Sequence, residues 1–245
     1  MNLSQSRKLK IMLPKIIIGV IILVVGVMAF GILTGKGEPP PFLADPSISD
    51  QSACPDPLIQ TPVDLTKVTA ILYPGQERGG DFKPHGGFRF DNTKDNNLEV
   101  RAPMEAVLSE ASQYIEQGEV QYLLDFLSDC GIRYRFDHLL VLSPKIAKAV
   151  EGLPKPKTDD THTNSIKGEV KVERGEVIAT AVGLLGNSNV FVDFGVYDMR
   201  GKNKFQNPRD SAVCWFDLLP ASDSAKVKSL PPGDSKSGSQ SSLCK

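Results

Sequence analysis

The stretch "NVFVDFGVYDM" (residues 189–199) is the clearest β-strand in the sequence. Successive side chains of a strand point to opposite faces. One face is wholly apolar and consists of Val190, Val192, Phe194 and Val196. The other carries Phe191, Asp193 and Gly195. This alternation predicts a strand with one face on a hydrophobic core and a second, partly charged face.

A second stretch, "HGGFRFD" (85–91), repeats this division. Phe88 and Phe90 fall on one face, and the opposite face holds His85, Gly87, Arg89 and Asp91. Glycines within strands often mark the close approach of a backbone or a ligand. The alternative is that both polar faces are the solvated outer surface of a β-sandwich.

Most other segments between 65 and 220 are also typical of strands. "KVTAILYPG" (67–75) ends in a Pro-Gly turn, residues 119–142 divide at 129–131 into a hairpin, and 168–183 turn at Arg174-Gly175. One short helix is predicted over 143–153, with Ser143 as its cap and Pro144 at its first position. The predicted fold class is therefore all-β, or β-dominated.

The N-terminal part of the chain predicts a membrane anchor. Residues 16–33, "IIIGVIILVVGVMAFGIL", carry no polar or charged side chain and are long enough to cross a bilayer as a helix. We assign a transmembrane helix to 16–34, a basic cytoplasmic segment to 1–15 and a Pro-rich spacer to 35–64. A cleaved signal peptide is the alternative, although its apolar region is normally shorter.

The basic residues set the expected orientation. Four of them, Arg7, Lys8, Lys10 and Lys15, precede the apolar run, and only Lys36 follows it closely. Excess positive charge stays in the cytoplasm. We expect a single-pass protein of the plasma membrane, with a folded domain over 65–220 and a low-complexity tail over 221–245 outside the cytoplasm. Within this tail, residues 229–245 are expected to be disordered except near Cys244.

The cysteines agree with that compartment. Cys54, Cys130, Cys214 and Cys244 all lie on the predicted outer side and form no CxxC pair. Disulfides suit an oxidising space, so at least one bridge is expected, with Cys54 or Cys244 taking part. Four cysteines allow three pairings, and free buried thiols are the alternative.

Composition and motifs exclude several classes of function. The net charge of −1 gives no reason to expect a nucleic-acid partner. The segment "GQERGG" (75–80) lacks the Lys-Ser/Thr of a phosphate-binding loop, and no serine lies in a nucleophile-elbow pattern. Trp215, the only tryptophan, is interpreted as a core residue, and His162 in "TDDTHTNS" as a surface histidine.

Five segments in order resemble the lysostaphin or LytM type of zinc metallopeptidase domain, whose β-sheet fold is called the duplicated hybrid motif. They are "HGGFR" (85–89), "VRAPMEAVL" (100–108), "FDHL" (136–139), "VERGEVI" (172–178) and "FVDF" (191–194). The resemblance covers about residues 68–200. It implies that the domain has this fold, in a form whose zinc and catalytic positions are mostly replaced.

The replacements are found residue by residue. The resemblance matches His85 to the first zinc ligand and His138 to a catalytic histidine. Arg89 stands where the family has the ligand Asp, Asp193 where it has the ligand His, and Phe191 where it has the other catalytic His. A catalytic zinc needs three protein ligands and an open position. We therefore expect no catalytic residue, no metal and no cofactor.

The two changed ligand positions suggest a substitute for the metal. In the family geometry they converge on one ion, so we predict an ion pair between Arg89 and Asp193 across the groove. Asp91 lies on the same face and remains an alternative third ligand.

Three functions follow from these observations. The first is non-catalytic binding or scaffolding in the cell envelope, with a polymer or a partner protein as ligand. The second is a metallohydrolase that acts on cell-wall peptide through a rearranged metal site; zinc is expected only here. The third is a structural ectodomain of a membrane assembly.

The predicted topology has a direct test. Because the basic flank precedes the apolar run, protease added to intact cells should digest residues 40–245. Full protection of that region, with digestion only after the cells are permeabilised, would show that the orientation is wrong.

Overall fold

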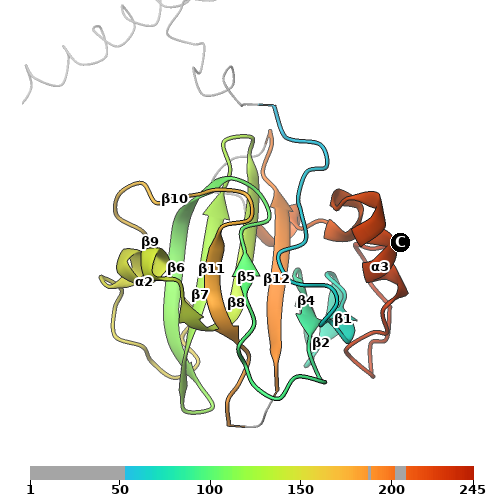
Figure 1. Ribbon diagram of the computed structural model, residues 1–245, viewed down its shortest axis with the longest axis horizontal. Coiled ribbons are helices and arrows are strands. Elements are labelled where there is room, and N and C mark those ends of the chain that lie inside the picture. Colours follow the sequence, from blue (N-terminus) through green and yellow to red (C-terminus); the bar gives the residue numbers. More distant parts are fainter. Residues whose placement is uncertain (1–52, 187–188, 202–207) are drawn as a thin grey trace, which may run out of the picture. The chain divides into compact units, whose positions relative to one another are not determined.

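A computed structural model of the chain describes residues 53–186, 189–201 and 208–245 (Figure 1). The predicted cytoplasmic segment 1–15, the predicted membrane helix 16–34 and the first part of the spacer, 35–52, lie outside the described residues. Among the described residues, no helix has the length and apolar character needed to cross a membrane.

The described part is built on a twisted, mostly antiparallel sheet of ten strands. The main path runs β1-β4-β12-β8-β7-β6-β10; β11 pairs with β5 and β8, and β9 pairs with β6. These strands are β1 (Ala70–Leu72), β4 (Gly86–Arg89), β5 (Val100–Arg101), β6 (Ala106–Glu116), β7 (Glu119–Leu127), β8 (Ile132–Leu142), β9 (Asn164–Ser165), β10 (Lys171–Val172), β11 (Val177–Val182) and β12 (Phe191–Asp198). The predicted β-dominated fold class is confirmed.

Smaller elements complete the domain. β2 (Gln76–Arg78) and β3 (Asp81–Lys83) form a separate hairpin. The helical elements are α2 (Pro144–Val150), η2 (Pro208–Ser211), η3 (Trp215–Leu218) and α3 (Ala221–Ser229). The helix predicted from Ser143 and Pro144 is confirmed, although the Ser143 side chain makes no capping hydrogen bond.

The turns lie where the sequence predicts them. The β7–β8 hairpin turns at 128–131, where Gly131 takes the left-handed conformation with φ of 81°. The turn between β10 and β11 likewise uses Gly175, with φ of 85°. Only glycine takes this conformation without steric cost, so these two residues determine where the strands end.

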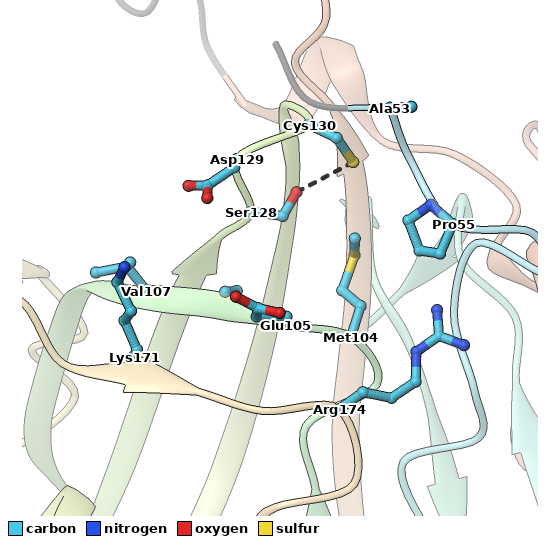
Figure 2. Close-up of a pocket in the computed structure, with 11 residues that line it drawn as sticks. Ala53, Pro55, Met104, Glu105, Val107, Ser128, Asp129, Cys130, Lys171 and Arg174 are labelled. Atoms are coloured by element: carbon cyan, nitrogen blue, oxygen red, sulfur yellow. Dashed lines mark hydrogen bonds between the residues drawn. The ribbon is translucent and has the colours of Figure 1, made fainter.

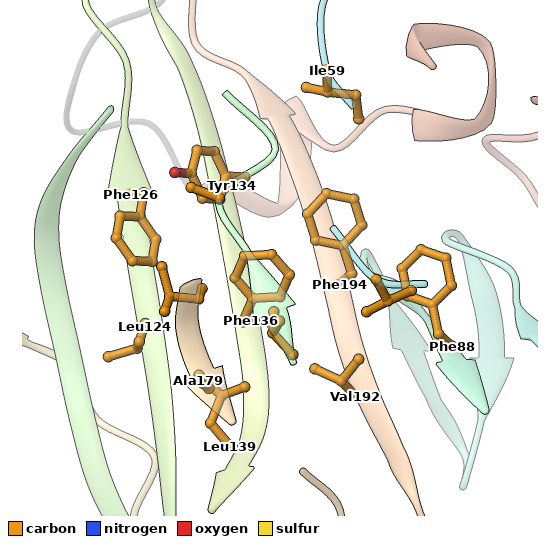
Figure 3. Packing of buried hydrophobic residues seen from close by; sticks show 14 of the residues in the cluster. Ile59, Phe88, Leu124, Phe126, Tyr134, Phe136, Leu139, Ala179, Val192 and Phe194 are labelled. Atoms are coloured by element: carbon orange, nitrogen blue, oxygen red, sulfur yellow. The ribbon is translucent and has the colours of Figure 1, made fainter. Parts of the chain in front are cut away.

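One face of the sheet carries the core (Figure 3). The apolar face predicted for 189–199 is confirmed, because all four of its residues are at most 3% exposed. Phe194 lies 5.0 Å from Phe136 and 5.1 Å from Trp215 between ring centroids. Trp215 is fully buried, so its predicted role as a core residue is confirmed. Aromatic contacts of this kind add to the free energy of area burial.

The N-terminal boundary of the domain differs from the prediction. Within the predicted spacer, Ile59 is fully buried and Val63 is 8% exposed. The Ile59 amide donates to the Leu218 carbonyl at 3.1 Å. The domain therefore includes the second half of the spacer, because its few apolar residues fall where they reach the core.

The C-terminal boundary also differs. The low-complexity tail predicted over 221–245 begins with α3, whose Val227 is fully buried. The part predicted to be disordered, from 229 onwards, continues along β1. Low-complexity composition does not prevent order here, because backbone hydrogen bonds to the sheet edge and a disulfide hold the segment.

All four cysteines are bridged. Cys54 pairs with Cys130, and Cys214 pairs with Cys244. The expectation that Cys54 or Cys244 takes part in a disulfide is confirmed for both. Each bridge ties a terminal segment to the domain. Two disulfides suggest an extracytoplasmic location, because such bonds persist in oxidising compartments.

Candidate functional site

A groove of about 670 Å³ lies on the polar face of the sheet. Its floor comes from β4, β8 and β12, and its rims come from β6, from the β2–β3 hairpin and from residues 233–235. His85, Arg89, His138 and Asp193, the four site residues predicted from the sequence, all line it. The polar faces predicted for the two strands therefore form a concave site.

A second cavity, of about 440 Å³, lies beside the Cys54–Cys130 bridge (Figure 2). Met104, Lys171 and Arg174 line it, together with the β7–β8 turn. Cys130 is the only predicted site residue there. The candidate site is therefore the groove.

Glycines allow the polar groups of the groove to meet. Gly87 pairs with Asp193 across β4 and β12. A Cβ atom at Gly87 would lie 2.6 Å from the Val192 carbonyl oxygen and 3.0 Å from Asp193 Oδ1. A Cβ atom at Gly195 would lie 3.0 Å from the His85 Cβ. The close approach predicted from the glycines therefore occurs between parts of this domain.

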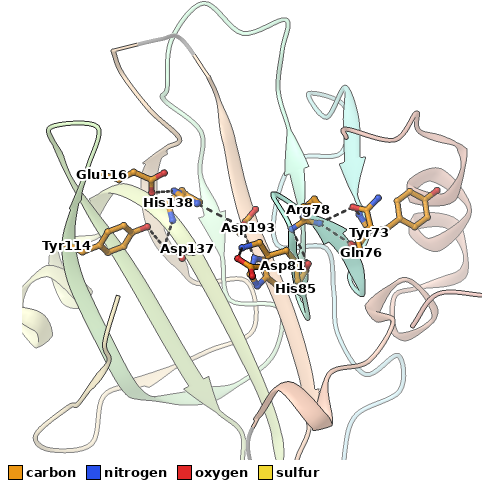
Figure 4. Close-up of polar contacts among 11 residues, drawn as sticks. Tyr73, Gln76, Arg78, Asp81, His85, Tyr114, Glu116, Asp137, His138 and Asp193 are labelled. Atoms are coloured by element: carbon orange, nitrogen blue, oxygen red, sulfur yellow. Dashed lines mark hydrogen bonds and ion pairs between the residues drawn. The ribbon is translucent and has the colours of Figure 1, made fainter. Parts of the chain in front are cut away.

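The centre of the groove is a contact between histidine and carboxylate (Figure 4). His85 Nε2 lies 3.0 Å from Asp193 Oδ2, and His138 Nε2 lies 3.9 Å from the same oxygen. Burial alone would raise the pKa of Asp193, but the charge and hydrogen bond of His85 and the charges of His138 and Arg78 lower it to about 2. Asp193 is therefore ionised at neutral pH.

His138 reaches the groove because β8 bulges. Strict alternation would place it on the face opposite to Asp137, but the pairing with β7 shifts register between Tyr122 and Leu124. His138 takes a left-handed φ of 61°, and its backbone amide donates to Asp137 Oδ1 at 2.8 Å. Bulges commonly redirect a side chain in this way. Both residues therefore line the groove.

Three carboxylates surround the His138 ring. Burial lowers its pKa, but Asp137, Asp193 and Glu116 outweigh that and raise it above its ordinary value. Glu116 Oε2 lies 3.4 Å from His138 Nδ1, a contact that does not meet hydrogen-bond geometry. The His138 ring also lies 4.5 Å from the Phe191 ring. This end of the groove is acidic.

The opposite end is basic, and its main residue was missed by the sequence analysis. Arg78 in β2 donates to the carbonyls of Tyr73 at 3.1 Å and His85 at 3.2 Å, and to Gln76 Oε1 at 3.0 Å. It thus holds the backbone of His85 in place. Lys83 and Arg89 line the same end. No motif identifies Arg78, because only the β2–β3 hairpin brings it to the groove.

The predicted ion pair between Arg89 and Asp193 is wrong. Arg89 Nη2 instead lies 2.6 Å from Asp91 Oδ1, and Asp193 contacts His85. The register explains the difference, because Arg89 lies opposite Phe191 and Asp193 lies opposite Gly87. Asp91, two residues along the same strand face, is the nearest carboxylate. Asp91 also accepts a hydrogen bond from Thr69 Oγ1 at 2.9 Å, and Thr69 directly precedes β1. This bond holds the Asp91 carboxylate beside the start of β1.

The groove does not fit the zinc site of the resembled family. No group of three or more His, Cys, Asp or Glu side chains able to hold a metal ion occurs among the described residues. The resemblance implies that Arg89 stands at one ligand position, and arginine is a permanent cation that offers no lone pair. Arg78 places a second positive charge close enough to influence Asp193.

His162, with a side chain 96% exposed, is a surface residue as predicted.

The pKa of Asp193 predicts a pH dependence of stability. A carboxyl group whose pKa is lower in the folded state stabilises it at pH values above the unfolded pKa, and the stabilisation is lost as the pH falls from about 4 to about 2. Asp193→Asn should therefore lower the free energy of unfolding by about 2 kcal/mol at pH 7. Urea denaturation should show this difference shrinking towards zero near pH 2.

Asp129→Asn, at an exposed position in the β7–β8 turn, is the matched control and should change stability little at any pH. An Asp193→Asn deficit of equal size at pH 2 and pH 7 would mean that the loss does not come from the ionised carboxylate.

Comparisons with known proteins add a structural likeness. No protein-family model matches the chain, and no curated protein sequence matches it. The fold is similar to the NMR solution structure of lysostaphin, with a TM-score of 0.39 and 13% sequence identity. The match covers 64% of this chain and 58% of that chain, so the chain spans less than two thirds of the length of lysostaphin.

Proposed function

We propose that this chain displays a non-catalytic, metallopeptidase-like β-domain outside the cytoplasm, anchored by the helix predicted over 16–34. In this proposal the groove binds an extended polar polymer of the cell envelope. A partner protein as ligand is the alternative occupant, and the test below separates the two.

The observation that carries the proposal is the distribution of charge along the groove. Arg78 and Lys83 come from the β2–β3 hairpin and Arg89 from β4, whereas Glu116 and Asp137 come from β6 and β8 on the other side of β12 (Figure 4). Arg135 and Asp234 also line the groove. Hydrogen bonds hold the side chains of Arg78, Arg89 and Asp137, so these three lose little side-chain entropy when a ligand binds. A groove with a basic end and an acidic end suits a ligand whose carboxylate and amide or amino groups are spaced along one strand.

The same residues argue against hydrolysis by the mechanism of the resembled family. Phe191, in the place of a catalytic histidine, can neither donate nor accept a proton. The Asp193 carboxylate is already in contact with His85. Binding is therefore the function that these side chains support best.

The binding proposal predicts the effect of removing a groove cation. Lys83, whose side chain is 36% exposed, should contact carboxylates of the polymer. Lys83→Gln should reduce co-sedimentation of the purified full chain with insoluble cell-wall polymer several-fold, and added salt should narrow the difference from wild type.

Lys94→Gln is the matched control, because Lys94 is exposed and lies outside the groove. Equal loss in both variants would indicate non-specific attraction to the polymer. No sedimentation of the wild-type chain, together with retention of a soluble envelope protein that depends on Lys83, would favour the partner-protein alternative.

A zinc titration separates binding from metallohydrolysis. Because the groove offers no set of three ligands among the described residues, calorimetry with zinc chloride should show no tight 1:1 binding by the full chain. The His85→Ala variant should give the same trace. Tight stoichiometric binding that His85→Ala abolishes would overturn the non-catalytic proposal and support the metallohydrolase.

A further inference from the structure

The C-terminal segment forms an extra edge of the sheet. β1 is the first strand of the main path, so one of its edges has no strand partner. The Ile71 amide donates to the Pro231 carbonyl at 2.9 Å, and the Gly233 amide donates to the Ile71 carbonyl at 2.7 Å. Figure 1 shows this segment beside β1 and β2. Residues 231–233 thus cover an edge that would otherwise be exposed.

The segment then continues over the β2–β3 hairpin. Gln76 Nε2 donates to the Gly238 carbonyl at 2.6 Å, and the Ser242 amide donates to the Gly75 carbonyl at 3.0 Å. The Ser241 hydroxyl donates to the Pro74 carbonyl. These contacts are to backbone and polar groups.

The same segment forms a wall of the groove at its basic end. Gly233, Asp234 and Ser235 line the groove. Gly233 packs so closely on Arg89 that an added Cβ would lie 2.6 Å from Arg89 Cδ. The Asp234 carboxylate lies near enough to Arg78 for the two charges to favour each other. The wall therefore lies against Arg89 and beside Arg78, which are two of the three cations assigned to the basic end in the proposed function.

Little apolar burial holds this wall in place. No residue from 231 to 245 is buried, whereas the segment tied by Cys54 includes the fully buried Ile59. The covalent cross-link that attaches this segment to the core is the Cys214–Cys244 bridge. Cys214 directly precedes the buried Trp215 and is fixed to the core. Cutting this one bridge removes the covalent link between the segment and the core.

We propose that residues 231–245 are a releasable wall of the groove, latched by the Cys214–Cys244 disulfide, and that reduction by a dithiol opens the basic end. In the exchange, one thiolate of the dithiol attacks a sulfur of the bridge and forms a mixed disulfide. The second thiolate resolves it. The dithiol is oxidised to a disulfide, and Cys214 and Cys244 take up two electrons and two protons as free thiols.

The inference rests on the proposed function for its purpose, since an open basic end would admit more of a carboxylate-bearing polymer. Its test uses no polymer, so the two proposals fail independently. The probe is phenylglyoxal, which modifies arginine, with the rate at each arginine read by peptide mass spectrometry on the full chain.

The arginines provide matched internal controls. Arg89, in contact with the wall, and Arg135, on the groove floor away from it, have side chains 26% and 28% exposed. Arg101 lies outside the groove and is 45% exposed. In the Cys214→Ser/Cys244→Ser variant, Arg89 should react at least about threefold faster than in the oxidised wild type, while Arg135 and Arg101 keep their rates. Dithiothreitol should accelerate Arg89 in the wild type and not in the variant.

A second variant, Cys214→Ser with the chain ended after Leu230, removes the wall altogether and should match the first variant at Arg89. If Arg89 is modified faster only in this truncated variant, the segment stays in place without the bridge. The proposal that the disulfide holds it closed would then be wrong. If the modification rate of Arg89 is unchanged in both variants, residues 231–245 do not shield Arg89 and the proposal is wrong. If Arg135 and Arg101 accelerate as much as Arg89, the bridge is needed for the fold itself and the proposal is also wrong.

Discussion

The pairing of β12 between β4 and β8 governs both halves of this domain. This register places Phe194 opposite Gly86 on one side and Phe136 on the other, and places Asp193 opposite Gly87 and Asp137. A shift by one residue would turn every side chain of β12 to the other face. The aromatic core would then face the groove and the carboxylate would face the core, so core and groove depend on the same alignment.

The register also decides which charges meet. Asp193 has a side chain only 13% exposed, and burial of a lone carboxylate is costly. His85, His138 and Arg78 offset that cost from three separate parts of the chain. Glycine at 87 and 195 leaves room for the contact, because a Cβ at either position would collide with it. The groove is therefore an arrangement of charged side chains that hold one another in place.

The same polar face of the sheet continues beyond the groove, where its charged side chains pair with one another. Asp125 is fully buried, and both Arg133 and Arg135 donate to its carboxylate, at 3.0 Å and 2.9 Å to Oδ1. Arg133 also reaches Glu110 at 3.0 Å. Removing one member of such a network leaves an uncompensated charge. These pairs hold β7 and β8 against β6, so the floor of the groove has a rigid base, whereas the C-terminal wall contributes no buried residue.

The sequence by itself determined the strands, their apolar faces and the turns at Gly131 and Gly175, because alternation and glycine conformation are local properties. The family resemblance, and not the periodicity, implied that His85, His138 and Asp193 belong to one site. Tertiary structure alone decided the partners. Arg89 binds Asp91 because the register separates it from Asp193, and Asp137 and His138 share the groove only through a bulge. Arg78 comes from a separate hairpin, and the tail is ordered by a sheet edge and a bridge to Cys214. Each of these contacts joins segments distant in the chain, and periodicity along one segment carries no information about them.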